Sequence, residues 1–386
     1  MTDALHFEWP QLRVALEGRS SIDFPRLHLK SKAEAKLFLL SYGYDIEDPL
    51  VREEVWRIYF QSLAFIRTHL LDPGEEMPVE LMSRGSQSEI VKLLLEASTR
   101  GSTLGRWSCS ILRVMHIISH LDNDLRSEFF QYARDQIFER FNKLVVPAGP
   151  RRWEITLGNR KVTIIRYLRK YRKDRDSTLT KLLSKPTAIA EEIYDRIGIR
   201  FVTETRFDAY HLVQILFEVG AISVANIQPG RSVNSLLPLE VLEQSIEQMR
   251  SEIARGELSP QAAELRLRKI EEEGLVAPTA LTRNPFSSSW YRAIQFTCRQ
   301  LITAPTPAFR LYQEMKAEFD KTKAGAAMLK KVPIMIRENR SFYYPFEIQI
   351  LDKESYVESI GGRSRHREYK AKQRLLARNR VLRDLV

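Results

Sequence analysis

Three residues near the middle of the chain, Lys173, Ser177 and Lys181, recur at intervals of four. Ammonium groups and a hydroxyl at this spacing can hold a polyphosphate by point charge and hydrogen bonding. Further along, Glu347 and Gln349 alternate with isoleucines, so their carboxylate and amide project from one face of a strand. The first of these patterns favours a phosphorylated substrate.

The charge distribution points the same way. The chain has 386 residues and a net charge of +11. Between Arg363 and the end there are nine Lys or Arg residues against two acidic ones, and residues 166–175 form a second basic run. Basic clusters favour phosphate-bearing partners such as nucleotides or RNA. A solvated, charged helix face is the alternative for the C-terminal cluster.

Residues 346–370, FEIQILDKESYVESIGGRSRHREYK, resemble the end of the catalytic domain of RelA/SpoT-type alarmone synthetases, the pyrophosphokinases that make (p)ppGpp. The family pattern is Glu-x-Gln-Ile, a downstream Gly, and His-x-x-Tyr-Lys. It is met by Glu347, Gln349, Ile350, Gly362, His366, Tyr369 and Lys370. The resemblance implies that Glu347 binds Mg²⁺ and helps to deprotonate the attacking hydroxyl. It also implies that Gln349, His366, Tyr369 and Lys370 bind the acceptor, and that the last three close the nucleotide site from the following helix. The family's Arg after Gln-Ile is Leu351 here.

The segment Ile193-Tyr-Asp-Arg-Ile-Gly-Ile-Arg200 is similar to a second signature of the same family. By this resemblance Asp195 is the other Mg²⁺ ligand and Arg200 stacks on the adenine of ATP. Carboxylate oxygens suit a hard cation, which phosphoryl-type transfer requires. A surface aspartate at a helix end is the alternative for Asp195.

The run from Lys173 to Lys181 resembles the family's ATP-binding block, which implies that Lys173, Ser177 and Lys181 contact ATP. The family's leading arginine, which stacks on adenine, is Tyr171 here. A tyrosine ring can also stack on a base, so Tyr171 and Arg200 are expected to enclose the adenine.

The most altered block is the acceptor loop, where the family has Asn-Gly-Tyr-x-Ser-x-His. Here Asn284 and Ser288 are kept, while Pro285, Phe286 and Trp290 replace the other three residues. Phenylalanine keeps the π-face that stacks on the acceptor base and loses the hydroxyl. Proline removes a backbone donor. The resemblance implies that Asn284, Phe286, Ser288 and Trp290 bind the acceptor.

The elements that must position these residues follow from periodicity. Helices are predicted over residues from about 30 to 145, and the last of them covers 126–144. Capping boxes at Ser31–Glu34 and Ser86–Glu89 mark two helix starts. The Pro- and Gly-containing stretch 145–152 predicts a domain boundary. We therefore expect a helical domain over 1–147, with no assigned role, and a synthetase-like domain over 148–386.

The second domain has mixed periodicity. A β-hairpin is predicted over 153–157 and 161–166, with further strands over 199–203, 221–227, 292–302, 332–336 and 343–351. Helices are predicted over 180–196 and 208–219. A charged helical hairpin at about 236–274, with a turn at Gly256 and a cap at Ser259-Pro260, interrupts the domain. Together these predict an α+β fold, and the resemblance implies a nucleotidyltransferase-like mixed sheet with flanking helices.

The remaining features predict a cytoplasmic protein. Cys109 and Cys298 form no disulfide or zinc pattern, the N-terminal residues lack signal-peptide features, and no apolar stretch is long enough to cross a membrane. His116 and His120 lie one helical turn apart, with Asp122 and Asp124 behind them. A metal or hydrolase site is one interpretation of this group, and ordinary helix residues are the other.

Three hypotheses remain. The first is a Mg²⁺-dependent pyrophosphokinase that transfers diphosphate from ATP to the ribose 3′-hydroxyl of GDP or GTP, as in the bacterial stringent response. The second keeps this donor but takes an RNA end as acceptor, held by the basic tail 363–386. The third is a catalytically degenerate nucleotide or RNA sensor.

Overall fold

The computed structural model describes residues 14, 16–17, 20–82, 89–124, 127–171, 174–185, 196–236, 239–273, 292–319, 321–322, 338–361 and 366–385. The chain divides into two compact units. The first, here called the helical unit, comprises residues 1–127, 173–193 and 366–386. The second, here called the sheet unit, comprises residues 128–172 and 194–365.

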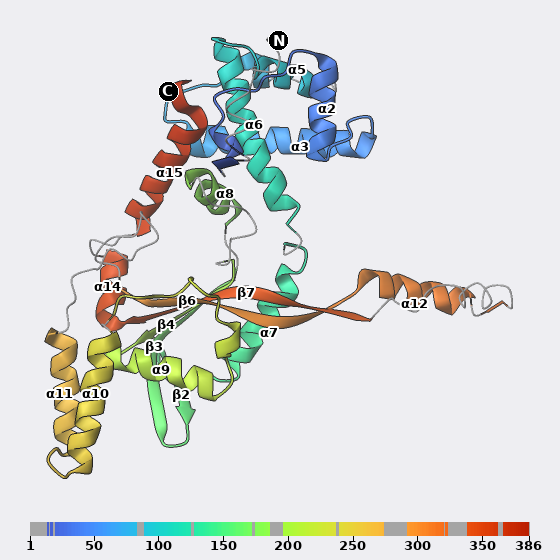
Figure 1. Ribbon diagram of the computed structural model, residues 1–386. Coiled ribbons are helices and arrows are strands. Elements are labelled where there is room, and N and C mark those ends of the chain that lie inside the picture. The colour runs from blue at the N-terminus through green and yellow to red at the C-terminus, as the bar shows by residue number, and fades with distance from the viewer. Residues whose placement is uncertain are drawn as a thin grey trace. The chain divides into compact units, whose positions relative to one another are not determined.

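The helical unit draws its elements from three separate parts of the chain (Figure 1). They are η2 (Ser21–Asp23), α2 (Lys32–Tyr42), α3 (Pro49–Phe65), the π-helical η3 (Ile66–Leu70), α4 (Val79–Met82), α5 (Glu89–Glu96), α6 (Thr103–Asp122), α8 (Arg175–Ser184), α15 (His366–Leu382) and η7 (Arg383–Leu385). Ser31 caps α2 as predicted, since its side chain accepts the Glu34 amide, and Gly43 ends the helix at φ 107°. The Glu34 carboxylate accepts the Lys30 amide at 2.8 Å.

Helices α8 and α15 belong to this unit because their apolar faces are buried in its core. Leu179, Leu182 and Leu183 of α8, and Val381 and Leu382 of α15, join one cluster with buried residues of α3, α5 and α6. These side chains come from positions far apart in the sequence. The unit is therefore assembled by long-range packing.

The sheet unit surrounds one seven-stranded sheet in the order β1-β2-β3-β4-β7-β6-β5. Its elements are α7 (Phe130–Asn142), β1 (Val146–Gly149), β2 (Arg152–Leu157), β3 (Arg160–Lys170), β4 (Gly198–Thr203), α9 (Arg206–Glu218), η6 (Val224–Asn226), β5 (Val233–Asn234), α10 (Leu239–Ala254), α11 (Pro260–Glu273), β6 (Ile294–Pro305), α12 (Pro307–Phe319), β7 (Asn339–Asp352) and α14 (Lys353–Gly361). β4 and β7 pair in parallel, and the other neighbours are antiparallel. The expected α+β class is confirmed.

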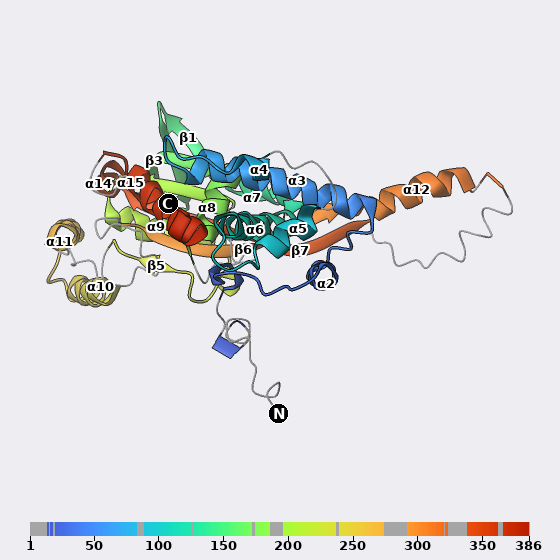
Figure 2. The same ribbon diagram turned by 90° about the horizontal axis from the view of Figure 1, so that it is seen from above.

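Helices α7 and α9 cover the same face of the sheet (Figure 1). Alternate strand residues such as Ile199, Phe201, Ile348 and Ile350 pack against them in one core. Because side chains alternate along a strand, the residues between these apolar ones project from the opposite face of the sheet. That opposite face carries the polar residues described below. Beyond the sheet, α12 runs on from the end of β6 (Figure 2).

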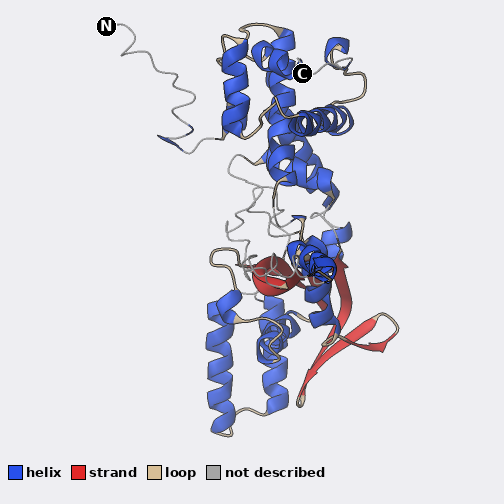
Figure 3. Ribbon diagram, turned by 90° about the vertical axis from the view of Figure 1, so that its right-hand side faces the viewer, coloured by secondary structure: helices blue, strands red, loops and turns tan. Residues whose placement is uncertain are grey.

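The predicted helical hairpin is confirmed as α10 and α11, seen as an antiparallel pair in Figure 3. Gly256 lies in the turn at φ 76°, and the Ser259 hydroxyl accepts the Ala262 amide at 3.2 Å. An ion pair at 2.8 Å joins Arg266 of α11 to Glu252 of α10.

Two sequence-based predictions differ from the structure. The stretch 145–152, predicted as a domain boundary, contains β1 and the turn to β2, and α7 before it packs on the sheet. Domains of 1–147 and 148–386 therefore do not match the compact units. In the predicted strand 221–227, Ala221 and Ile222 pack in the core with α9, and residues 224–226 form the 3-10 helix η6 with Val224 72% exposed. Ile227 makes an isolated β-bridge to Cys298.

Other predicted elements are confirmed in part. The helix predicted over 180–196 begins earlier, at Arg175, because Asp174 caps it by accepting the Ser177 amide at 2.9 Å. Residues 186–195, the predicted strand 332–336 and Ser86 of the second capping box lie outside the described residues. None of the helices in the described part of the chain is both long and apolar enough to cross a membrane.

Candidate functional site

A hydrogen-bonded cluster of four polar residues lies on the sheet face opposite α7 and α9. At its centre is Glu347, whose two carboxylate oxygens each accept an amide. Gln295 Nε2 donates to Oε1 at 2.5 Å and Gln349 Nε2 donates to Oε2 at 2.7 Å. Gln349 Oε1 in turn accepts Arg200 Nε at 2.9 Å and Nη2 at 2.7 Å. These bonds fix the orientation of the carboxylate.

Strand register brings the cluster together. Gly198 is paired with Glu347 and Arg200 with Gln349 across the parallel β4–β7 ladder. Gln295 lies opposite Gln349 across the antiparallel β6–β7 ladder. Three strands therefore supply one row of polar side chains, and a slip of one residue would move any of them to the apolar face.

Gly198 leaves room for a lysine beside this row. Lys170 of β3 is the cross-strand partner of Gly198, and a Cβ at Gly198 would lie 3.6 Å from both Cβ and Cδ of Lys170. The aliphatic part of the lysine therefore lies over the glycine, which is itself paired with Glu347. This places a cationic side chain on the same face as the carboxylate.

The cluster offers defined chemistry. A carboxylate oxygen has two lone pairs, so one that accepts an amide can also contact a hard cation or take a proton. Mg²⁺ is usually held by one or two carboxylates together with substrate phosphates and water. No group of three or more His, Cys, Asp or Glu residues able to hold a metal occurs among the described residues. Glu347 supplies one carboxylate of the type that such a site uses.

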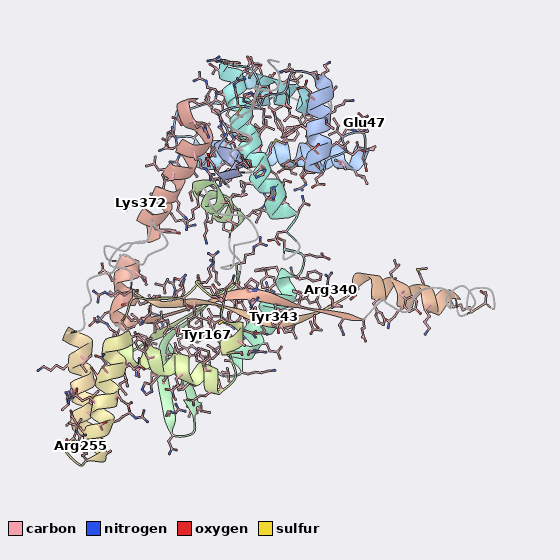
Figure 4. The ribbon with its side chains drawn as sticks, viewed as in Figure 1. Glu47, Tyr167, Arg255, Arg340, Tyr343 and Lys372 are labelled. Carbon is pink, nitrogen blue, oxygen red and sulfur yellow. The ribbon has the colours of Figure 1, made fainter. Side chains whose placement is uncertain are left out.

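Tyr171 is not close to Arg200 in the way the sequence predicted. Its ring packs edge-to-face on Phe138 of α7, with centroids 5.3 Å apart, and Arg169 lies 5.4 Å from its centroid. Tyr167 (labelled in Figure 4) stacks on Phe201 on the same side. Arg200 lies on the neighbouring strand β4 and bonds Gln349 on the other face. The predicted adenine sandwich of Tyr171 and Arg200 is therefore absent from this arrangement.

Five of the predicted site residues that the structure describes lie in the helical unit, and none of them belongs to the cluster around Glu347. Ser177 and Lys181 are half-buried on α8, where hydrogen bonding to the Ser177 amide lowers the pKa of Asp174. Tyr369 and Lys370 are on the first turns of α15, and the Tyr369 hydroxyl accepts Gln373 Nε2 at 3.0 Å. His366 begins α15, and its side chain is outside the described part.

The other predicted residues fall outside the described part of the chain. They are Asp195, Lys173, Asn284, Phe286, Ser288 and Trp290. It therefore remains a prediction that Asp195 pairs with Glu347. It also remains a prediction that the loop 284–290 binds the acceptor.

The histidine group on α6 is occupied by ordinary contacts. His116 Nδ1 is 2.7 Å from the Tyr42 hydroxyl. Asp122 accepts Arg175 at 2.8 and 2.9 Å and pairs with Arg57 at 3.1 Å. These partners favour helix packing over a metal or hydrolase site.

Three arginines of the basic C-terminal tail form ion pairs within the helical unit. Arg380 donates to both Asp23 oxygens at 2.7 and 3.0 Å. Arg374 pairs with Asp72 at 2.7 Å, and Arg378 pairs with Glu75. Lys372 (labelled in Figure 4) is exposed. Several charges that the sequence offered to RNA thus neutralise the unit's own acids.

Gln295 is the functional candidate that sequence reasoning missed. Its segment, Ile-Gln-Phe-Thr-Cys, alternates polar and apolar residues and so indicated a polar face. The register that sets Gln295 beside Glu347 depends on pairing across residues 306–338, which the sequence pattern does not define.

Comparisons with protein-family models, with curated proteins and with solved structures found no match.

Proposed function

We propose that this protein is a Mg²⁺-dependent nucleotide pyrophosphokinase with a nucleotidyltransferase-like core, related to the RelA/SpoT-type synthetases. It would transfer the β,γ-diphosphate of ATP to the ribose 3′-hydroxyl of GDP or GTP. The observation that carries the proposal is the cluster itself. Arg200, Gln349 and Glu347 match family positions, and residues 149 positions apart form direct hydrogen bonds on neighbouring parallel strands.

The chemistry of the cluster suits this reaction. Diphosphate transfer depends mainly on positioning and on electrostatic stabilisation of phosphate charge. In this proposal Glu347 holds the cation together with Asp195 and the phosphates of ATP, while Gln295 and Gln349 fix the carboxylate. Lys170 lies on the same face and supplies positive charge near the phosphates.

The test is an assay of the full chain with Mg²⁺ and ATP labelled in the β and γ phosphates. GDP, GTP and total RNA are offered as acceptors in separate reactions, and labelled products are resolved. The proposal predicts transfer to GDP or GTP. Transfer to RNA alone would support the second hypothesis, and nucleotide binding without transfer would support the sensor.

Two substitutions sharpen the assay. Glu347→Gln and Asp195→Asn each remove one ligand charge and should abolish transfer, with a thermal midpoint close to that of the wild type. Glu243→Gln, on the exposed surface of α10, is the matched control and should be fully active. Full activity of Glu347→Gln would overturn the proposed mechanism.

A further inference from the structure

A mostly apolar cavity lies inside the helical unit, away from the residues used above. Its volume is about 290 Å³. The walls come from α2, α3, α5, α6 and the segment 21–27, with side chains such as Leu39, Val55, Ile58, Leu94, Leu112 and Met115. An apolar cavity of about 150 Å³ already binds benzene, and ligand pockets begin near 300 Å³. The space is therefore large enough for a ligand of one or two fused rings.

The charged groups in the wall are already paired. Arg113 is buried, and its guanidinium donates to the carbonyls of Ile22, Phe24 and Val381 at 3.0, 2.7 and 2.6 Å. Arg26 donates to the Ser98 carbonyl at 3.2 Å. No acidic residue is among the described residues that line the cavity. Three N–H groups of Arg113 are thus engaged by carbonyls, and an anion entering the cavity would lose its own hydration.

The remaining polar groups in the wall are neutral. Burial lowers the pKa of His116 to about 4, so its imidazole is uncharged at neutral pH, and burial also raises the pKa of Tyr42. The Tyr44 hydroxyl bonds Ser119 Oγ at 2.5 Å. Tyr42 keeps 38% of its surface accessible although its hydroxyl is desolvated, as expected for a ring that faces a cavity. The hydrogen-bonded pair of Tyr42 and His116 thus offers a ligand one uncharged polar contact.

We propose that the helical unit binds an uncharged, mostly apolar small molecule in this cavity. Its apolar body lies among the side chains of α2, α3, α5 and α6. At most one polar group of the ligand meets the Tyr42–His116 pair. Removal of apolar surface from water supplies the affinity, at about 25 cal/mol for each Å². The guanidiniums disfavour a cation, and the loss of hydration disfavours an anion.

The test uses the full chain and the neutral fluorophore N-phenyl-1-naphthylamine, whose emission rises in apolar sites. We expect saturable binding of one molecule per chain. The sulfonated analogue 8-anilinonaphthalene-1-sulfonate has the same rings and a negative charge, and should bind about tenfold more weakly or worse. Equal or tighter binding of the sulfonate would overturn the uncharged class. Absence of saturable binding of the neutral probe would overturn the site.

Substitutions locate the bound probe. Val55→Phe and Leu112→Phe each place a ring in the cavity from a different helix and should weaken binding at least about tenfold. Two variants are used because overpacking can destabilise one of them, and circular dichroism checks that each is folded. Val79→Phe, at a position 65% exposed and outside the cavity, is the control and should bind normally. Unchanged binding in a folded Val55→Phe or Leu112→Phe variant would place the probe elsewhere and contradict the proposal.

Discussion

At the scale of single residues, the candidate site depends on how Glu347 is held. Two glutamines from different strands donate to its two oxygens, and Arg200 fixes which way the Gln349 amide faces. The residues Glu347, Gln349 and Arg200 could be predicted from the sequence, because alternation and resemblance act over short segments. Gln295 could not, since its place beside Glu347 is set by strand register over a long connection.

Replacement of Gln295 tests the role of the cluster. Gln295→Leu removes the donor to Glu347 Oε1, so the carboxylate can turn away from its productive orientation. We expect diphosphate transfer to fall about 10- to 100-fold, a usual cost for loss of a residue that orients a ligand. The control is Gln214→Leu on α9, which removes a Gln–Glu hydrogen bond of 2.9 Å on the surface and should leave the rate unchanged. An equal loss in both variants would contradict a positioning role.

His116 makes the stability of the helical unit depend on pH. Its pKa falls from 6.5 to about 4 through burial first and then through the charges of His120 and Arg380. In the unfolded chain the imidazole of His116 therefore takes up a proton near pH 6.5, whereas in the folded chain it stays neutral at that pH. Stability is full above pH 6.5 and is lost as the pH falls toward 4, by about 1–3 kcal/mol.

Urea unfolding at pH 7.5, 5.5 and 4.5 measures this effect. His116→Gln cannot take up the proton and should show a flatter pH dependence than the wild type over this range. His211 of α9 also has a pKa lowered mainly by burial. His211→Gln should therefore remove a separate, smaller part of the pH dependence of stability. The prediction is refuted by identical pH profiles for His116→Gln and the wild type.

At the scale of elements, local patterns predicted most strands and helices that the structure contains. The β2–β3 hairpin, β4, β6, β7, α9, α10 and α11 were all predicted, because alternation, caps and glycine turns act within a few residues. The segment 221–227 was apolar enough to suggest a strand. Its first residues instead pack under α9, so tertiary packing overrode the β propensity.

The attachment of α15 gives a prediction at this scale. Arg380 is largely buried and joins α15 to Asp23 and to the Leu183 carbonyl of α8 at 3.0 Å. Arg380→Met leaves those acceptors without their donor, so we expect a loss of about 2–4 kcal/mol in the free energy of unfolding. Arg266→Met breaks the more exposed pair with Glu252 and should cost less than about 1 kcal/mol. Thermal and urea unfolding compare the two variants; equal losses would show that Arg380 is an ordinary surface charge.

At the scale of the whole molecule, the chain passes between the two units after residues 127, 172, 193 and 365. Predicted domains of 1–147 and 148–386 followed the change in periodicity along the sequence. Periodicity reports the type of each element and not its packing partner. Helices α8 and α15 therefore could not be assigned to the helical unit from the sequence, and α7 could not be assigned to the sheet.

This division predicts that residues 1–147 do not fold alone. The fragment lacks α8 and α15, whose side chains Leu179, Leu182, Leu183, Val381 and Leu382 are buried in the helical unit. At about 1.5–3 kcal/mol for each large apolar side chain, the loss is about 8–15 kcal/mol. Domains are stable by only about 5–15 kcal/mol, so the deficit matches the whole stability of the unit.

Circular dichroism during heating measures the outcome. The fragment 1–147 should show no cooperative transition, whereas a single chain that joins residues 1–127, 173–193 and 366–386 through Gly/Ser linkers should melt cooperatively. The fused chain is the matched control because it restores the missing helices without the sheet unit. A cooperative transition of 1–147 near the midpoint of the full chain would mean that α8 and α15 are dispensable to the helical core.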